Sequence, residues 1–231
     1  GRDGRNWNRS YEMRPDGAPW AGIVLVHGLT DSPYSLRAVA EAFRARGVLV
    51  LVPRMPGHGT TPSGLLDVDR DDWAAVTALA MAELRRRLGP ERPLLLGGYS
   101  NGAAVALRHA VDALDDPALE RPRQLYLFSP AIGVSAFGRF AGWHRVLAIL
   151  PGLEKFRWDG VLPEFDPYKY NSFPKIAGHQ SWALTHALEG DLARLARDGR
   201  IGELPPVLAF QSLADATVHT EAVVELSLIH I

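Results

Sequence analysis

Apolar runs of about five residues alternate with helical patterns along most of this chain. The apolar runs cover residues 22–26, 48–52, 93–97, 124–128 and 207–211. Between them the patterns favour helices at residues 32–46, 71–88, 101–114 and 184–197, and another from Thr220 onward. Strands that are apolar on both faces and separated by helices are typical of parallel sheets covered on both sides. The pattern therefore predicts an α/β fold with a doubly wound, mostly parallel sheet.

Two of the expected helices have recognisable ends. Ser32 is expected to cap the first helix, with Pro33 in its first turn and Gly47 at its end. The basic run at residues 85–87 closes the second helix, where cations suit the negative end of the helix dipole. We interpret this run as helix-terminal rather than as a ligand-binding patch.

One long stretch breaks the alternation between the fourth and fifth expected strands. Residues 132–178 contain nine aromatic residues. An insertion of this size after a central strand predicts a cap over the carboxyl edge of the sheet. The alternative is that these aromatic side chains only form a small satellite core. In this division, residues 1–131 and 179–225 form the core of the domain and residues 132–178 form the cap.

Composition and charge exclude several classes of protein. Of the 231 residues, 47% are hydrophobic, which supplies a large core and argues against disorder. The formal net charge is -1 without a basic stripe, so neither nucleic acid nor an anionic membrane is an expected partner. The absence of cysteine excludes disulfides, thiolate catalysis and cysteine-based metal sites. No apolar run approaches the roughly 18 residues of a membrane span.

The sharpest chemical signal lies where the third expected strand meets a helix. The residues Gly98-Tyr99-Ser100-Asn101-Gly102 form Gly-x-Ser-x-Gly in a strand–turn–helix context. A chain that turns from strand to helix within one residue strains that residue and crowds the positions two residues away on each side. Glycine at both positions fits this crowding. Ser100 is the candidate nucleophile, exposed at a helix N-terminus; a structural Gly-Ser turn is the alternative.

A second candidate element, His27-Gly28-Leu29-Thr30, follows the first expected strand. Acyl transfer needs two donors, usually backbone N–H groups, aimed at the oxyanion. Asn101 supplies one because it follows the nucleophile, and Leu29 in the loop after the His-Gly pair supplies the other. We interpret His27 and Gly28 as support for this loop, with the His27 side chain as a brace rather than as the catalytic base.

These motifs resemble a known family. The residues His27-Gly28-Leu29-Thr30-Asp31-Ser32-Pro33, followed by Pro53-Arg54-Met55-Pro56-Gly57-His58-Gly59, are similar to the monoglyceride lipase and carboxylesterase branch of the α/β-hydrolases. Bacterial lysophospholipase-like proteins share this pattern, and the resemblance covers residues 23–224. It implies the α/β-hydrolase fold, a loop near the pocket at residues 56–59 and a structural role for His58. The motifs are specific for the fold and not for a substrate.

The catalytic triad of this fold follows the chain order Ser, then Asp or Glu, then His. Asp215, after the fifth expected strand, is the candidate acid that would orient the histidine; a helix N-cap aspartate is the alternative. The base is expected roughly 20–28 residues beyond the acid, after another helix and strand. Only His219 and His230 follow Asp215, and His219 lies too near the acid in sequence to fit that layout.

The last six residues, 226–231, are similar to the translation of a transposase end sequence used in making sequencing libraries. We therefore expect a non-native tail, a catalytic histidine beyond residue 225 of the natural chain, and little hydrolase activity without it. A genuine helix end is the alternative. Because the chain begins at Gly1 rather than Met, an export signal is compatible with it, and the cytoplasm is only the default compartment.

The expected mechanism is two-step acyl transfer through an acyl-enzyme on Ser100, with no metal or organic cofactor. The aromatic cap favours small-molecule carboxylic esters with an apolar acyl group. Dehalogenases and epoxide hydrolases resemble this layout but use an aspartate nucleophile, so Ser100 argues against both. Two alternatives stay open: another serine-based activity (aminopeptidase, acyltransferase or C–C hydrolase) and a non-catalytic binding module. The sequence leaves the oligomeric state open.

Overall fold

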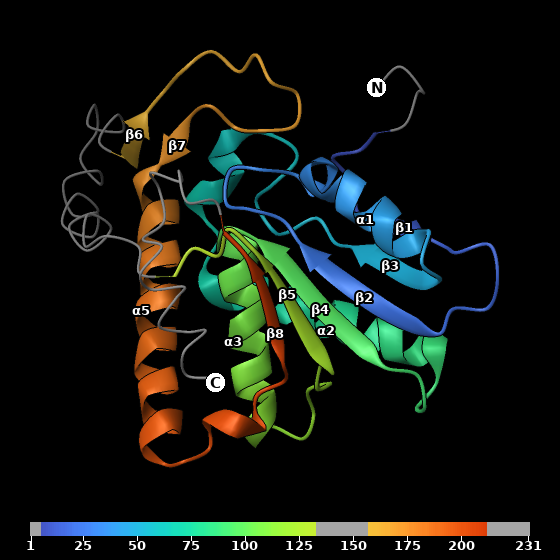
Figure 1. Cartoon of the computed structure of the whole chain (residues 1–231). Helices are drawn as coiled ribbons and strands as arrows, with labels where there is room; N and C mark the ends of the chain where they lie inside the picture. Colours follow the sequence, from blue (N-terminus) through green and yellow to red (C-terminus); the bar gives the residue numbers. More distant parts are fainter. Residues whose placement is uncertain (1–5, 133–156, 212–231) are drawn as a thin grey trace.

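The computed structural model describes residues 6–132 and 157–211. Its centre is a six-stranded sheet of order β1-β3-β2-β4-β5-β8 (Figure 1). The strands are β1 (Tyr11–Met13), β2 (Ala21–Val26), β3 (Val48–Val52), β4 (Leu94–Tyr99), β5 (Gln124–Phe128) and β8 (Val207–Phe210). The five strands from β2 onward that the apolar runs predict are parallel neighbours, which confirms the predicted fold class.

The edge strand β1 was not predicted from the apolar runs. It is three residues long and pairs antiparallel with β3, with Tyr11 opposite Val52 and Met13 opposite Val50. A strand this short offers too few positions for a period of two to be recognised. Its pairing with β3, rather than its own sequence, defines it.

Helices cover both faces of the sheet. Along β2, Val24 and Val26 belong to one apolar cluster, whereas Ile23 and Leu25 belong to another on the opposite face. The first cluster is closed by α2 (Arg70–Leu88), α3 (Asn101–Asp115) and α5 (Lys175–Arg197), and the second by α1 (Arg37–Arg44). Burial on both faces explains why the strands read as continuous apolar runs rather than as alternating ones.

The expected helix at residues 32–46 is divided into two parts. A 3-10 turn, η1 (Pro33–Leu36), precedes α1, because the Ser35 N–H donates to the Ser32 carbonyl at 3.1 Å. Ser32 occupies the N-cap position of this turn, as predicted, but its buried hydroxyl makes no cap hydrogen bond. Gly47 follows the end of α1 with a positive φ of 81°.

Residues close in sequence determine where α2 begins and ends. Asp69 accepts the N–H groups of Asp71 and Asp72, and the Asp72 side chain accepts the Asp69 N–H in return, which completes a capping box. At the other end, Arg85 donates to the carbonyl groups of Gly89, Pro90 and Arg92. The basic run therefore lies in the last turn of α2, where cations complement the orphan carbonyls.

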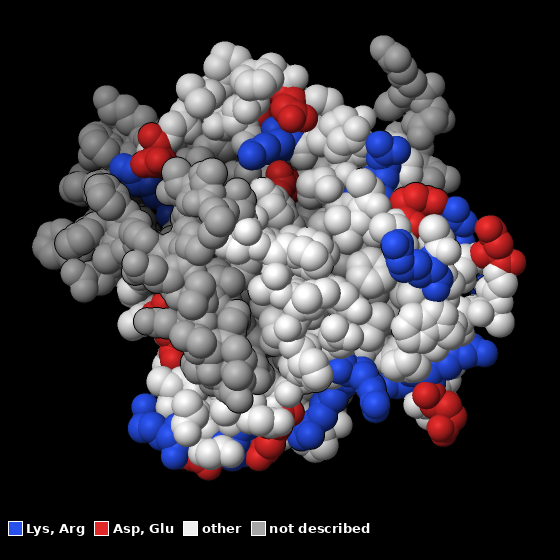
Figure 2. All heavy atoms as spheres, viewed as in Figure 1, with Lys and Arg blue, Asp and Glu red and all other residues white. Residues whose placement is uncertain are grey.

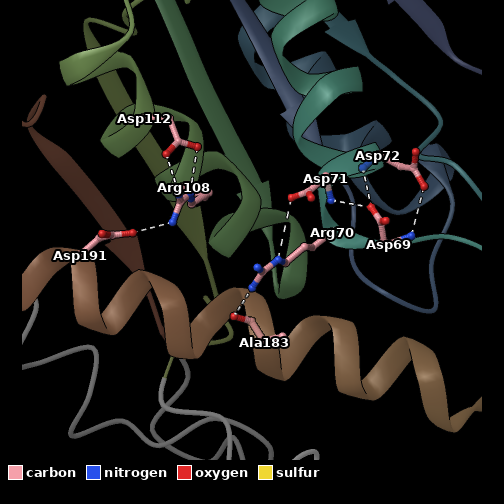
Figure 3. A network of polar contacts seen from close by, with 8 residues as sticks. All are labelled: Asp69, Arg70, Asp71, Asp72, Arg108, Asp112, Ala183 and Asp191. Carbon is pink, nitrogen blue, oxygen red and sulfur yellow. Dashed lines mark hydrogen bonds and ion pairs between the residues drawn. The ribbon is translucent and has the colours of Figure 1, made fainter. Parts of the chain in front are cut away.

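Helix α5 begins nine residues before the helix expected at residues 184–197, so the expected boundary at 178/179 falls inside it. Its first turns carry no side-chain cap and include a glycine, so the sequence gives no start signal there. Packing defines the helix instead. Arg108 of α3 reaches Asp191 of α5 at 2.6 Å, and Arg70 of α2 donates to the Ala183 carbonyl at 2.9 Å (Figure 3).

The described part of the predicted cap lies at the end of the sheet toward which the parallel strands point (Figure 1). It contains β6 (Trp158–Gly160) paired antiparallel with β7 (Phe173–Pro174). Two further 3-10 turns, η2 (Pro62–Leu66) and η5 (Ile201–Glu203), follow β3 and α5. On the face shown in Figure 2, acidic and basic side chains are interspersed rather than gathered by sign. Residues 133–156 of the predicted cap lie outside the described residues.

Candidate active site

Ser100 occupies the single residue between β4 and α3. Its backbone has φ 55° and ψ −120°, in the region that residues with a Cβ rarely adopt. Neighbouring backbone holds it there: the Ser100 N–H donates to the Phe128 carbonyl at 2.9 Å, and the Ser100 carbonyl accepts the Ala131 N–H at 3.1 Å. The turn therefore places Ser100 at the carboxyl edge of the sheet, at the N-terminus of α3.

The two glycines that flank Ser100 lie against backbone. A Cβ added at Gly98 would lie 2.2 Å from the Gly102 carbonyl oxygen, and one added at Gly102 would lie 2.2 Å from that of Val26. Because backbone atoms rather than flexible side chains make these contacts, a larger residue at either position requires α3 or β2 to move. The glycines thus let α3 approach the strand ends closely enough to form the turn.

The first amide groups of α3 have no carbonyl partner within the helix. Asn101 belongs to this first turn and is only 5% exposed. Its side-chain oxygen accepts the hydroxyl of Ser181, from α5, at 2.8 Å. This bond fixes the residue whose N–H is the first candidate oxyanion donor. Sequence reasoning missed Ser181, because it lies 80 positions from Asn101 and in no motif.

His27 braces the loop that follows β2. Its Nδ1–H donates to the Gly28 carbonyl at 2.9 Å, and its Nε2 accepts the Met55 N–H at 3.1 Å. Burial lowers the pKa of His27 to about 3, with a further contribution from the neighbouring His58. A neutral imidazole with both nitrogens bonded to backbone is suited to holding a loop and not to taking a proton from Ser100.

His58 contacts the same loop, and its ring packs edge-to-face against that of His27. Its Nε2 lies 2.7 Å from the Leu29 carbonyl oxygen, and its Nδ1 lies 2.8 Å from that of Pro56. Burial lowers the pKa of this buried imidazole, whereas the carbonyl groups around it raise it. Within the described residues, the Leu29 N–H itself has no hydrogen-bond acceptor, which leaves it available to a ligand.

The alpha/beta hydrolase family model matches residues 23–225. This chain belongs to the alpha/beta hydrolase family. The match includes β2 from Ile23 onward, the Ser100 turn and every later strand of the described sheet. Ser100, Leu29 and Asn101 therefore lie, in this alpha/beta hydrolase, at the edge of the sheet where the fold places its ligands.

Relatives of this alpha/beta hydrolase include lipolytic enzymes. A segment of 86 residues is 34% identical to the thermostable monoacylglycerol lipase of Bacillus sp. (strain H-257), and it covers 37% of this chain. The match spans only a third of that lipase, 33% of its length. The fold resembles a solved structure from work on LipS and LipT, two metagenome-derived lipolytic enzymes. That likeness has a TM-score of 0.72 at 23% identity and covers 96% of this chain and 82% of that one.

A second solved structure with the same fold is the monoacylglycerol lipase of Paleococcus ferrophilus. It aligns with a TM-score of 0.68 at 19% identity, over 95% of this chain and 83% of that one. At such identities the likeness establishes the fold and leaves the substrate open.

The candidate acid and the two histidines that follow it in the sequence lie in the last twenty residues. Asp215, His219 and His230 lie outside the described residues, as does the helix expected from Thr220. Within residues 6–132 and 157–211, the structure records no hydrogen bond between a histidine and Ser100. The same residues contain no cluster of side chains suited to a metal ion. None of their helices has the length and apolar character needed to cross a membrane.

Proposed function

We propose that this protein is a serine hydrolase that cleaves carboxylic esters with an apolar acyl group, through an acyl-enzyme on Ser100. The observation that carries the proposal is the backbone of Ser100, held at a positive φ between β4 and α3. Such strain persists where the surrounding structure imposes it, and it is concentrated at functional sites. A module that only binds a ligand has no need of a strained serine.

The proposed reaction uses groups at the carboxyl edge of the sheet. A histidine removes the Ser100 proton, and the Ser100 oxygen attacks the ester carbonyl carbon. The oxyanion that forms accepts hydrogen bonds from the N–H groups of Leu29 and Asn101. The alcohol leaves with the proton, and water then cleaves the acyl-enzyme. In this scheme Asp215 orients the histidine, which follows the acid in the chain order of this fold.

The apolar acyl group is the finer part of the proposal. The aromatic residues of the predicted cap support it, as does the likeness to monoacylglycerol lipases. In the described part of that cap, Val161, Leu162 and Phe165 are exposed apolar side chains. Exposed apolar side chains in the predicted cap support recognition of an apolar acyl chain rather than of a polar leaving group.

The test is Ser100→Ala in the full-length protein, with Ser63→Ala as the control on an exposed serine. Hydrolysis of p-nitrophenyl esters with two to twelve acyl carbons should fall by several orders of magnitude in Ser100→Ala and stay unchanged in the control. Labelling by a fluorophosphonate should be lost in parallel. Retention of more than about a tenth of the rate would contradict the role of Ser100. If the enzyme prefers amides to esters, or transfers the acyl group to an acceptor other than water, the proposed ester hydrolase activity is wrong.

A further inference from the structure

Tyr170, in the segment between β6 and β7, contacts both loops that border the candidate oxyanion site. Its N–H donates to the Thr30 carbonyl at 2.7 Å, after β2. Its hydroxyl donates to the Gly57 carbonyl at 3.1 Å and accepts the Thr60 N–H at 2.9 Å, both after β3. The hydroxyl therefore anchors this segment on one loop while the backbone of the same residue holds the other.

The contact with Thr30 completes a series along the oxyanion loop, residues 28–30. Three consecutive carbonyl oxygens lie within hydrogen-bond distance of three different residues. The Gly28 oxygen lies 2.9 Å from His27 Nδ1, the Leu29 oxygen lies 2.7 Å from His58 Nε2, and the Thr30 oxygen accepts the Tyr170 N–H. The Tyr170 ring also lies nearly parallel to the His58 imidazole, at 10° and 6.3 Å between ring centres.

This series controls the direction of the Leu29 N–H. A peptide unit is planar, so the direction of the Gly28 carbonyl fixes the Leu29 N–H, which points the opposite way. The contacts at the Leu29 and Thr30 carbonyl groups fix the next two peptide planes. Together the three contacts prevent the loop from rotating. Because oxyanion stabilisation depends on donors placed before the reaction, a small rotation of this loop weakens it.

We propose that Tyr170 is a positioning residue for ester hydrolysis. Its hydroxyl fixes it to the loop after β3, so that its backbone N–H holds the oxyanion loop with the Leu29 N–H facing the transition state. This inference rests on the proposed function. Tyr170 does not touch the reacting atoms; it acts through Thr30. It joins the described part of the cap to the oxyanion loop.

The test compares Tyr170→Phe with Tyr168→Phe in the full-length protein. Tyr168 lies two residues away in the same segment, its ring stacks on Tyr34 at 3.7 Å, and the structure records no hydrogen bond from its hydroxyl to another described residue. For Tyr170→Phe we expect kcat to fall by about 10-fold or more with KM within about two-fold, because the lost alignment affects the transition state and not the bound ester. Tyr168→Phe should keep both constants.

A second readout separates positioning from simple destabilisation. A trifluoromethyl ketone adds to Ser100 to give an anion at the oxyanion site, so its Ki should rise by the same factor as kcat/KM falls. Thermal melting of both variants checks that each is folded at the assay temperature. Unchanged kcat in Tyr170→Phe, unchanged Ki, or an equal loss in Tyr168→Phe would each overturn the inference. If wild type itself shows no Ser100-dependent hydrolysis, the proposed function fails instead.

Discussion

Replacement of Gly102 by alanine tests the close packing of α3 against β2. Both Gly102 and Gly190 are helical, in α3 and α5, so alanine improves the local helix propensity at each. Their surroundings differ. A Cβ at Gly190 meets nothing within 4 Å, whereas one at Gly102 would lie 2.2 Å from the Val26 carbonyl oxygen and 2.4 Å from that of His27. Comparing the two substitutions therefore isolates the effect of the close approach between α3 and the end of β2.

The magnitudes follow from these surroundings. Gly190→Ala should raise the free energy of unfolding by about 0.5–1 kcal/mol, the usual difference between glycine and alanine in a helix. Gly102→Ala should lower it by about 1–3 kcal/mol, the usual cost of forcing an extra carbon into a packed site, because the obstructing atoms are backbone. For a domain of this size, 1 kcal/mol corresponds to about 2–4 °C in Tm, so the two melting temperatures should differ by at least about 3 °C.

The assay is thermal melting, with urea unfolding as a second measure, on wild type and both variants. Gly102→Ala should also lower ester hydrolysis, since the displaced carbonyls of Val26 and His27 precede the Leu29 donor. A Gly102→Ala protein that melts at or above the wild-type temperature would refute the packing argument. Similar shifts in the same direction for both glycines would refute it equally.

Three further predictions follow from named contacts. Burial lowers the pKa of His27 from 6.5 to about 3. Between these two pH values, His27 is protonated in the unfolded chain and neutral in the folded protein. The free energy of unfolding, measured in urea, should therefore have its full value above pH 6.5 and fall on acidification by up to about 1.4 kcal/mol per pH unit. An equal fall per pH unit in His27→Gln would contradict this. Asp69→Ala should destabilise α2 by about 1 kcal/mol through loss of its cap, whereas the exposed Asp67→Ala should not, as melting would show. Ser181→Ala should lower the free energy of unfolding by about 1–2 kcal/mol, because the buried Asn101 oxygen loses its donor; no change in urea unfolding would contradict that bond.

The candidate nucleophile and the parallel sheet could be predicted from the sequence because each is encoded locally. The apolar strands reflect burial on both faces, and a run of five residues suffices to reveal it. The Ser100 turn needs glycine two residues away on each side, so its geometry is visible within five residues. The role of His27 as a loop brace was also proposed from its place directly after a strand.

Tertiary structure decided the elements whose stability comes from distant partners. Strand β1 exists through its pairing with β3, and the first turns of α5 are formed where no cap marks a start. Ser181 and Tyr170 reach the candidate site across 80 and 140 positions of sequence, from Asn101 and from Thr30. No local pattern encodes such contacts, because they depend on which segments the folded sheet brings together at its carboxyl edge. The sequence by itself determined the strained turn and the character of the sheet, and packing decided which residues hold that turn and its oxyanion loop in place.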